Sequence, residues 1–127
     1  MVAMDDNFIY YNANPKKDVT EDCVIRAIKT AVGLNYYAVD NLLDLVADTY
    51  NCDKFCVCCY HNLLDGVLEY PVIYCDNKET VGSVCAQYPN NKLIIRIEGH
   101  LTCSMYGKIV DLWNCQDKTV TCFWIIS

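Results

Sequence analysis

Three residues of the sequence, Cys23, His100 and Asp111, have side chains that together could perform nucleophilic catalysis. A cysteine thiolate attacks an acyl carbon when a histidine takes or shares its proton, and a carboxylate that orients the imidazole completes such a triad. Cys23 lies far from the other two residues in the chain. The hypothesis of a catalytic triad therefore depends on the elements that hold each residue.

His100 and Asp111 belong to a predicted β-hairpin. The segments 101–106 and 108–113 flank a tight turn at Gly107, which is typical of neighbouring antiparallel strands. A short hairpin of this kind folds Asp111 back to within side-chain reach of the imidazole. A carboxylate on an otherwise apolar strand is costly to bury without a partner, and the imidazole N–H is an obvious partner.

Cys23 falls in the first or second turn of a predicted helix. Asp18 or Thr20 is the expected N-cap, with Glu21 reaching back to the backbone in a capping box, and Gly33 is placed to end the helix. Unpaired N–H groups and the helix dipole lower the pKa of a thiol at a helix start. The neighbouring carboxylates oppose this effect, so a histidine would have to compensate. Without such a partner, a helical cysteine is an ordinary small buried residue.

Two more helices are expected before the β-rich part of the chain. One begins after Asn35 as its cap and runs to about residue 48, with Asp40 and Asp44 on its solvated face, where mutual repulsion is the expected result and no metal is predicted. The other follows Thr80 as its cap and ends before Pro89.

Strands are predicted mainly in the last third of the sequence. They cover residues 92–98, 101–106, 108–113 and 119–126, and residues 71–75 form a further short strand or an extended linker. Helices followed by strands predict an α+β domain, with N-terminal helices packed on a C-terminal antiparallel sheet. We expect one domain over residues 1–127, with residues 1–15 as an extended N-terminal segment.

The order and setting of the three residues resemble the papain-like cysteine peptidase superfamily, in which the nucleophile opens a helix and histidine and Asp/Asn follow on strands. More narrowly, the sequence is similar to a group of small papain-like proteins of bacteriophages and their hosts, over about residues 11–124. The segments that carry this similarity are Asp22-Cys23-Val24-Ile25-Arg26-Ala27, Gly99-His100-Leu101-Thr102, Gly107-Lys108 and Asp111-Leu112-Trp113-Asn114-Cys115.

The resemblance implies a papain-like fold and a hydrolase acting on a peptide, isopeptide or amide bond, with Cys23, His100 and Asp111 as catalytic residues. It implies a protein or peptide substrate and no cofactor. Papain-like enzymes usually place a glutamine a few residues before the cysteine, as an oxyanion donor. Here Lys17 occupies that offset, so Asn12 or Asn14 is the candidate donor, with Asn14 favoured.

A cysteine-rich segment offers an alternative chemistry. Cys52, Cys56, Cys58, Cys59 and His61 lie within ten residues, and thiolates with imidazole are zinc ligands. Structural zinc sites typically use two separated pairs of ligands, and the second pair is missing unless a distant cysteine folds back. Apolar residues continue beyond His61 at helical spacing, which favours core packing over zinc. His61 itself is predicted to be a surface or hydrogen-bonded residue.

Composition excludes several classes of function. The 127 residues carry a net charge of −6 without a Lys/Arg cluster, which argues against a nucleic-acid partner. No segment approaches the roughly 18 apolar residues of a membrane span, and the first residues do not form a signal peptide. The ten cysteines lie mostly in apolar, periodic segments, so we expect reduced thiols and a cytoplasmic protein of a bacterial or phage-infected cell.

Three functional classes stay open at this point. The first is a cysteine hydrolase, and the second is an acyltransferase or deamidase that uses the same triad. The third is a non-catalytic protein, such as a phage-encoded inhibitor, that keeps a papain-like shell as a binding surface.

Overall fold

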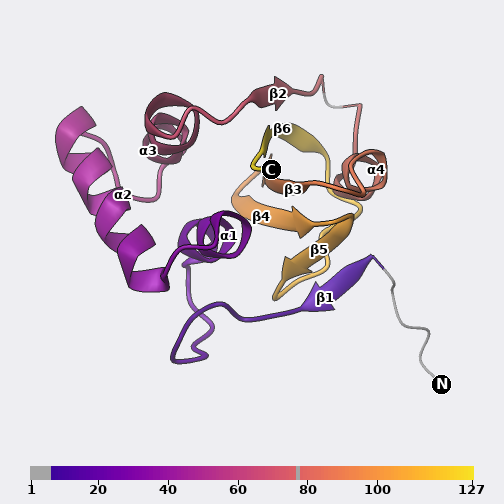
Figure 1. Cartoon of the computed structure of the whole chain (residues 1–127), viewed down its shortest axis with the longest axis horizontal. Coiled ribbons are helices and arrows are strands. Elements are labelled where there is room, and N and C mark those ends of the chain that lie inside the picture. Colours follow the sequence, from indigo (N-terminus) through magenta and orange to yellow (C-terminus); the bar gives the residue numbers. More distant parts are fainter. Residues whose placement is uncertain (1–6, 77) are drawn as a thin grey trace.

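The computed structural model describes residues 7–76 and 78–127, and within them the chain is α+β, as predicted (Figure 1). The helices are α1 (Cys23–Val32), α2 (Tyr36–Tyr50), α3 (Val57–His61), which continues into the π-helical turn η1 (Asn62–Val67), and α4 (Val81–Gln87). The strands are β1 (Phe8–Tyr10), β2 (Val72–Tyr74), β3 (Lys92–Ile97), β4 (His100–Met105), β5 (Lys108–Asp111) and β6 (Val120–Ile125).

These strands form one six-stranded sheet in the order β1-β5-β4-β3-β6-β2. The prediction of an antiparallel sheet made only by the C-terminal part was wrong, because β1 pairs with β5 in parallel and the sheet is mixed. Both edge strands come from outside the last third of the chain. Each has three residues, too few for an alternating pattern to reveal strand pairing. The extended segment predicted over residues 1–15 thus includes an edge strand, and its first six residues lie outside the described part.

Helices cover both faces of the sheet. Figure 1 shows α1, α2 and α3 on one side and α4 on the other, and the buried residues divide in the same way. On β3, Ile94 packs with the α1 layer, whereas Leu93 and Ile95 pack with α4. Successive side chains of a strand point to opposite faces, so a strand covered on both faces must be apolar throughout. Helix α1 lies directly over β4, which brings the start of the helix to the start of the strand.

Helix α1 begins at Cys23, later than a capping box at Asp18 or Thr20 would place it. Asp22 is the N-cap residue, but its side chain does not cap the helix, because its carboxylate accepts hydrogen bonds from other side chains. Cys23 is therefore the first helical residue. The helix ends as predicted at Gly33, whose φ of 85° lies in the left-handed region that favours glycine.

The remaining boundaries agree well with local sequence signals. The side chain of Asn35 accepts a hydrogen bond from the N–H of Tyr37 at the start of α2, and Thr80 caps α4 in a full capping box with Ser83. The aspartates of α2 differ from the prediction of simple repulsion. Lys54 lies between Asp40 and Asp44 and forms ion pairs with both.

Among the residues that the structure describes, no helix combines the length and the apolar character that a membrane crossing needs.

Candidate active site

The structure brings the three predicted residues together at the tip of α1. Cys23 is the first residue of α1, His100 the first residue of β4 and Asp111 the last residue of β5. Nε2 of His100 lies 2.7 Å from Oδ2 of Asp111, and the imidazole also hydrogen-bonds the thiol of Cys23. Because Nε2 is bound to Asp111, Nδ1 is the ring nitrogen left for the thiol. This line of thiol, imidazole and carboxylate is the arrangement that a Cys-His-Asp triad requires.

The surroundings of Cys23 favour its thiolate. Burial alone would raise the pKa of the thiol, yet the pKa lies below its ordinary value. The causes are the hydrogen bond with His100, a backbone hydrogen bond from Leu101 and the positive charges of His100 and Arg26. The position at the start of α1 adds unpaired N–H groups and the helix dipole. The predicted opposition by Glu21 and Asp22 is outweighed.

The same contacts act on His100 in the opposite direction. Burial alone would lower the pKa of the imidazole, but the hydrogen bonds and charges of Asp111 and Cys23 raise it to about 9. At neutral pH the imidazolium is therefore the favoured form. A raised pKa of the imidazole beside a lowered pKa of the thiol favours the thiolate–imidazolium pair, which forms when the neutral ring accepts the proton of Cys23.

The two histidines should titrate at opposite ends of the neutral range. We expect the pKa of His100 to be near 9, whereas burial holds that of His61 below its ordinary value of 6.5. Proton NMR of the ring resonances between pH 5 and 10, with His61→Asn for assignment, measures both. Since folding raises the pKa of His100, its imidazolium stabilises the fold fully below about pH 6.5, and this contribution is lost as the pH rises through 9. Two histidines that both titrate near 6.5 would contradict this account.

Asp111 is held as a carboxylate by four hydrogen-bond donors. Besides His100, they are the hydroxyl of Thr102 at 2.6 Å, the N–H of Leu112 at 2.7 Å and Nη1 of Arg26 at 2.9 Å. Burial would raise the pKa of Asp111, but these contacts lower it below its usual value. A carboxylate fixed from four directions holds the imidazole in one orientation, which is the role of the acid in a triad.

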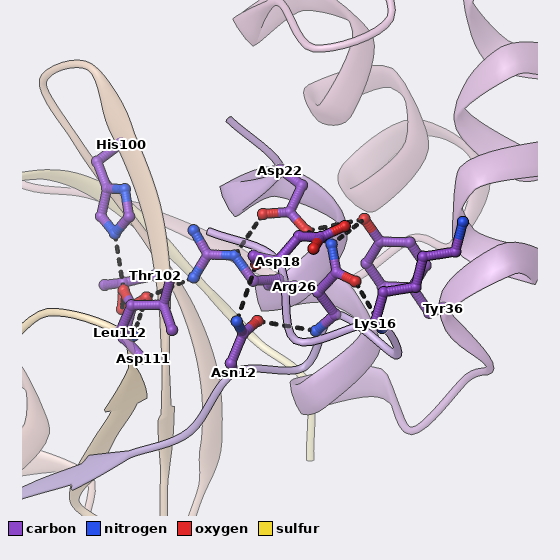
Figure 2. Close-up of polar contacts among 11 residues, drawn as sticks. Asn12, Lys16, Asp18, Asp22, Arg26, Tyr36, His100, Thr102, Asp111 and Leu112 are labelled. Atoms are coloured by element: carbon purple, nitrogen blue, oxygen red, sulfur yellow. Dashed lines mark hydrogen bonds and ion pairs between the residues drawn. The ribbon is translucent and has the colours of Figure 1, made fainter. Parts of the chain in front are cut away.

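Arg26 connects this carboxylate to a second one. Figure 2 shows its guanidinium between Asp22 and Asp111, with His100 beyond Asp111. Nε of Arg26 lies 2.7 Å from Asp22, which also accepts from the hydroxyl of Tyr36 at 2.8 Å. The side chain of Arg26 is 9% exposed, so the ion pairs are buried. Arg26 lies one turn after the cysteine and fixes the start of α1 to the strand that carries Asp111.

Sequence reasoning missed the part that Arg26 plays, although it left a signal. Arg26 stands inside the apolar stripe of its helix, between Ile25 and Ala27, and four residues after Asp22. A charged residue is almost never fully buried unless it is paired, so this position alone indicates an internal ion pair. Its second partner, Asp111, could not be read from local spacing.

Asn12 and Asn14 are structural residues in this fold. The side chain of Asn12 accepts from the N–H of Asn14 at 3.0 Å and donates to the carbonyl of Asp18 at 2.9 Å. Nδ2 of Asn14 donates to Asp22 at 3.1 Å, and its Oδ1 accepts from the N–H of Lys16. These contacts, with the Asn14 side chain buried, favour a structural role and give no support to the prediction of Asn14 as an oxyanion donor.

The substitution Asn14→Ala tests whether Asn14 has a structural role. We expect the free energy of unfolding to fall by about 1–3 kcal/mol, because the buried carboxylate of Asp22 loses a donor. Urea denaturation measures this loss, with Asn35→Ala, which removes the cap of α2 at the surface, as a comparison near 1 kcal/mol. An Asn14→Ala protein of unchanged stability would contradict the structural role.

A cavity of about 270 Å³ opens at Cys23 and His100. Its apolar wall consists of Val24, Phe55, Val57, Tyr60, Ile97 and Leu101. Two of these side chains remain accessible: Phe55 is 44% exposed and Val57 39% exposed. Arg96 and Glu98 are the charged residues of the lining besides His100. The thiol therefore faces a space that can hold a ligand.

Three of the four cysteines of the cysteine-rich segment, Cys52, Cys56 and Cys59, pack in or against the core. Cys59 and Tyr60 are buried, and the sulfur of Cys56 accepts a hydrogen bond from the N–H of Cys59 at the start of α3. Cys58 is exposed, and Cys52 is half-buried. All ten cysteines are free thiols. Over residues 7–76 and 78–127, these side chains do not form a group of three or more metal ligands, so the zinc alternative gains no support.

One group of possible metal ligands does occur in the described part of the chain. Donor atoms of His100, Asp111 and Cys115 lie within 4.8 Å of one another. Burial raises the pKa of the Cys115 thiol to about 11, and the guanidinium of Arg26 already contacts Asp111. A cation would have to displace a proton from Cys115 and lie close to this positive charge, so the group is a poor metal site, and His100 and Asp111 fit the triad with Cys23 better.

His61 is a hydrogen-bonded histidine, as predicted. Its Nδ1 lies 3.1 Å from Asp65, which also accepts from the indole N–H of Trp124 at 3.0 Å. The ring packs edge-on against Trp124 with a centroid distance of 4.7 Å. A carboxylate does accompany this histidine, four residues later on a helix.

Comparison of the chain with protein-family models, with curated proteins and with solved structures found no match in any of the three.

Proposed function

We propose that this protein is a papain-like cysteine hydrolase that acts on a peptide, isopeptide or amide bond. The observation that supports this proposal most strongly is the line from Cys23 at the first residue of α1, through His100, to the buried Asp111. A nucleophile at a helix start, with histidine and aspartate on neighbouring strands, is the arrangement expected from the papain-like resemblance. The accessible cavity beside the thiol supports a substrate site there.

Each residue has a defined part in the proposed reaction. His100 takes the proton of Cys23, and the thiolate attacks the acyl carbon of the substrate to form a C–S bond. The imidazolium then gives its proton to the leaving nitrogen as the C–N bond breaks, leaving a thioester on Cys23. Water attacks the thioester with His100 as base, and the acid product leaves as the thiolate re-forms. Asp111 keeps the imidazole in one orientation throughout.

The backbone N–H of Cys23 is the proposed oxyanion donor, because N–H groups in the first turn of a helix have no partner within the helix. The substrate is a protein or peptide, and the reaction needs no cofactor. The proposed location is the cytoplasm of a bacterial or phage-infected cell, where a reducing medium keeps a reactive thiol and nine further cysteines in the free state.

Activity-based labelling tests this proposal. A panel of peptide and ubiquitin-like probes with acyl electrophiles is incubated with the protein, and mass spectrometry identifies the modified cysteine. We expect labelling at Cys23, lost in Cys23→Ala and in His100→Ala. Incubation with the matching amide substrates then separates the products: a free acid indicates a hydrolase, and transfer to an added amine indicates an acyltransferase.

A non-catalytic binding protein gives a different result. In that case no probe modifies Cys23 faster than the exposed Cys58, and Cys23→Ala leaves the biological effect of the protein unchanged. That pair of results would rule out the catalytic proposal.

A further inference from the structure

Arg96 is a half-buried arginine beside the candidate nucleophile. On β3 it pairs with Leu101 of β4 and with Cys122 of β6. Residues paired directly across strands place their side chains on the same face, and those of Leu101 and Cys122 pack in the α1 layer. Arg96 therefore projects to the face that α1 covers. It lines the cavity at Cys23, whose thiol accepts the backbone hydrogen bond from Leu101.

The described partners of the Arg96 side chain are neutral. Its Nη1 lies 3.4 Å from Nε2 of His61, and the thiol of Cys122 is a second contact. Burial keeps the pKa of His61 below its ordinary value and raises that of Cys122 to about 11, so neither is charged at neutral pH. Neutral His61 can donate from Nδ1 to Asp65 and accept from Arg96 at Nε2, which fixes the guanidinium in place.

No carboxylate of the described residues lies in ion-pair contact with this guanidinium. Glu98 shares the cavity lining and is exposed, but it forms no ion pair with Arg96. The positive charge of Arg96 is thus not neutralised by a described carboxylate, although the chain has 16 acidic residues and only 10 basic ones. A guanidinium has five N–H donors, so its contacts with His61 and Cys122 leave others for a ligand.

We propose that Arg96 binds a carboxylate of the substrate, so that the site prefers a peptide or amide with a negative charge close to the reacting carbonyl. A planar guanidinium fits a carboxylate with two parallel hydrogen bonds. The nearby Glu98 disfavours a dianion such as phosphate, so a single negative charge matches the cavity better. The apolar wall with Phe55 and Val57 accommodates the hydrocarbon part of the same ligand. This inference rests on the proposed function of Cys23.

Two matched electrophiles test the inference. N-iodoacetyl-leucine and N-iodoacetyl-leucinamide differ only in the charge of the terminal group, and each alkylates a thiolate by displacing iodide. We expect wild-type Cys23 to react more efficiently with the carboxylate probe. Arg96→Gln should reduce that efficiency about tenfold, which is the size of one charge-assisted hydrogen bond, and leave the amide probe within about twofold. The efficiency of Arg96→Lys with the carboxylate probe should lie between that of the wild type and that of Arg96→Gln.

Lys92→Gln is the matched control, because it removes a positive charge from the same strand away from the cavity. Its ratio of carboxylate to amide labelling should equal that of the wild type. A measurement on the wild type alone avoids any folding defect of the variants: acetyl-leucine should slow labelling of Cys23 by the amide probe, and acetyl-leucinamide should not.

The outcomes separate this inference from the proposed function. Selective labelling of Cys23 with a carboxylate-to-amide ratio that Arg96→Gln does not change would overturn the role of Arg96 and leave the hydrolase proposal intact. Failure of both probes to label wild-type Cys23 would overturn the proposed function and the inference with it.

Discussion

His100→Ala should slow the alkylation of Cys23 by iodoacetamide at pH 7 by about 100-fold, within the range that a positioned acid-base group contributes. The reason is the balance of effects on the thiol. His100 supplies the hydrogen bond and the largest nearby charge that lower the pKa of Cys23, while burial acts to raise it. Without the imidazole, burial dominates and the thiolate fraction falls. Tryptic mass spectrometry over a time course of alkylation measures the rate at Cys23.

The same experiment contains its control. Cys58 is exposed and belongs to α3, outside the triad, so its rate should be unchanged in His100→Ala and should report on the reagent. A rate at Cys23 that stays within threefold of the wild type would mean that His100 does not activate the thiol.

Arg26→Met should lower the free energy of unfolding by about 3–5 kcal/mol, the usual cost of removing one partner from a buried ion pair. The substitution leaves the carboxylates of Asp22 and Asp111 buried, 6% and 4% exposed at the side chain, without the charge between them. A domain of this size is stabilised by only about 5–15 kcal/mol in total. Urea denaturation followed by circular dichroism measures the change.

Lys54→Met is the matched comparison, because Lys54 also lies between two aspartates. Its ion pairs with Asp40 and Asp44 are partly exposed, so we expect a loss below about 1 kcal/mol. Similar losses in both variants would show that burial of the Arg26 contacts has no special effect.

The sequence predicted those parts of the fold that local signals determine. Asn35, Thr80 and Gly33 mark helix ends through the chemistry of their own side chains or backbone, and the structure has those ends. The four C-terminal strands have apolar runs bounded by turns. The ends of β3, β4, β5 and β6 were each predicted to within one residue, apart from the end of β5, which was predicted two residues too late.

Features that depend on distant contacts were missed. Helix α1 starts at Cys23, later than the predicted caps at Asp18 or Thr20, and the contacts of Asn14, Tyr36 and Arg26 with the Asp22 carboxylate at this start could not be predicted from local spacing. The parallel pairing of β1 arises from a contact between residues about one hundred positions apart, for which a three-residue strand has no local pattern.

In the candidate site, too, residues with local signals were predicted and residues that act through distant contacts were missed. Cys23, His100 and Asp111 were predicted from residue type, chain order and the hairpin, and the structure brings them into contact. The residues that hold them in place, Thr102 and Arg26, contact Asp111 across other elements and could not be assigned from spacing. The hydrogen bond from Asn14 to Asp22, eight residues later in the chain, could likewise not be predicted from spacing, and it favours a structural role for this asparagine.

The most direct test of the account is the alkylation rate of all ten cysteines in the native wild-type protein as a function of pH. We expect Cys23 to react first at pH 7, ahead of the exposed Cys58, with a rate that is already high below the ordinary thiol pKa. A Cys23 that reacts no faster than the buried Cys103 or Cys115, or whose rate rises only near pH 9, would contradict the activated thiolate on which the account depends.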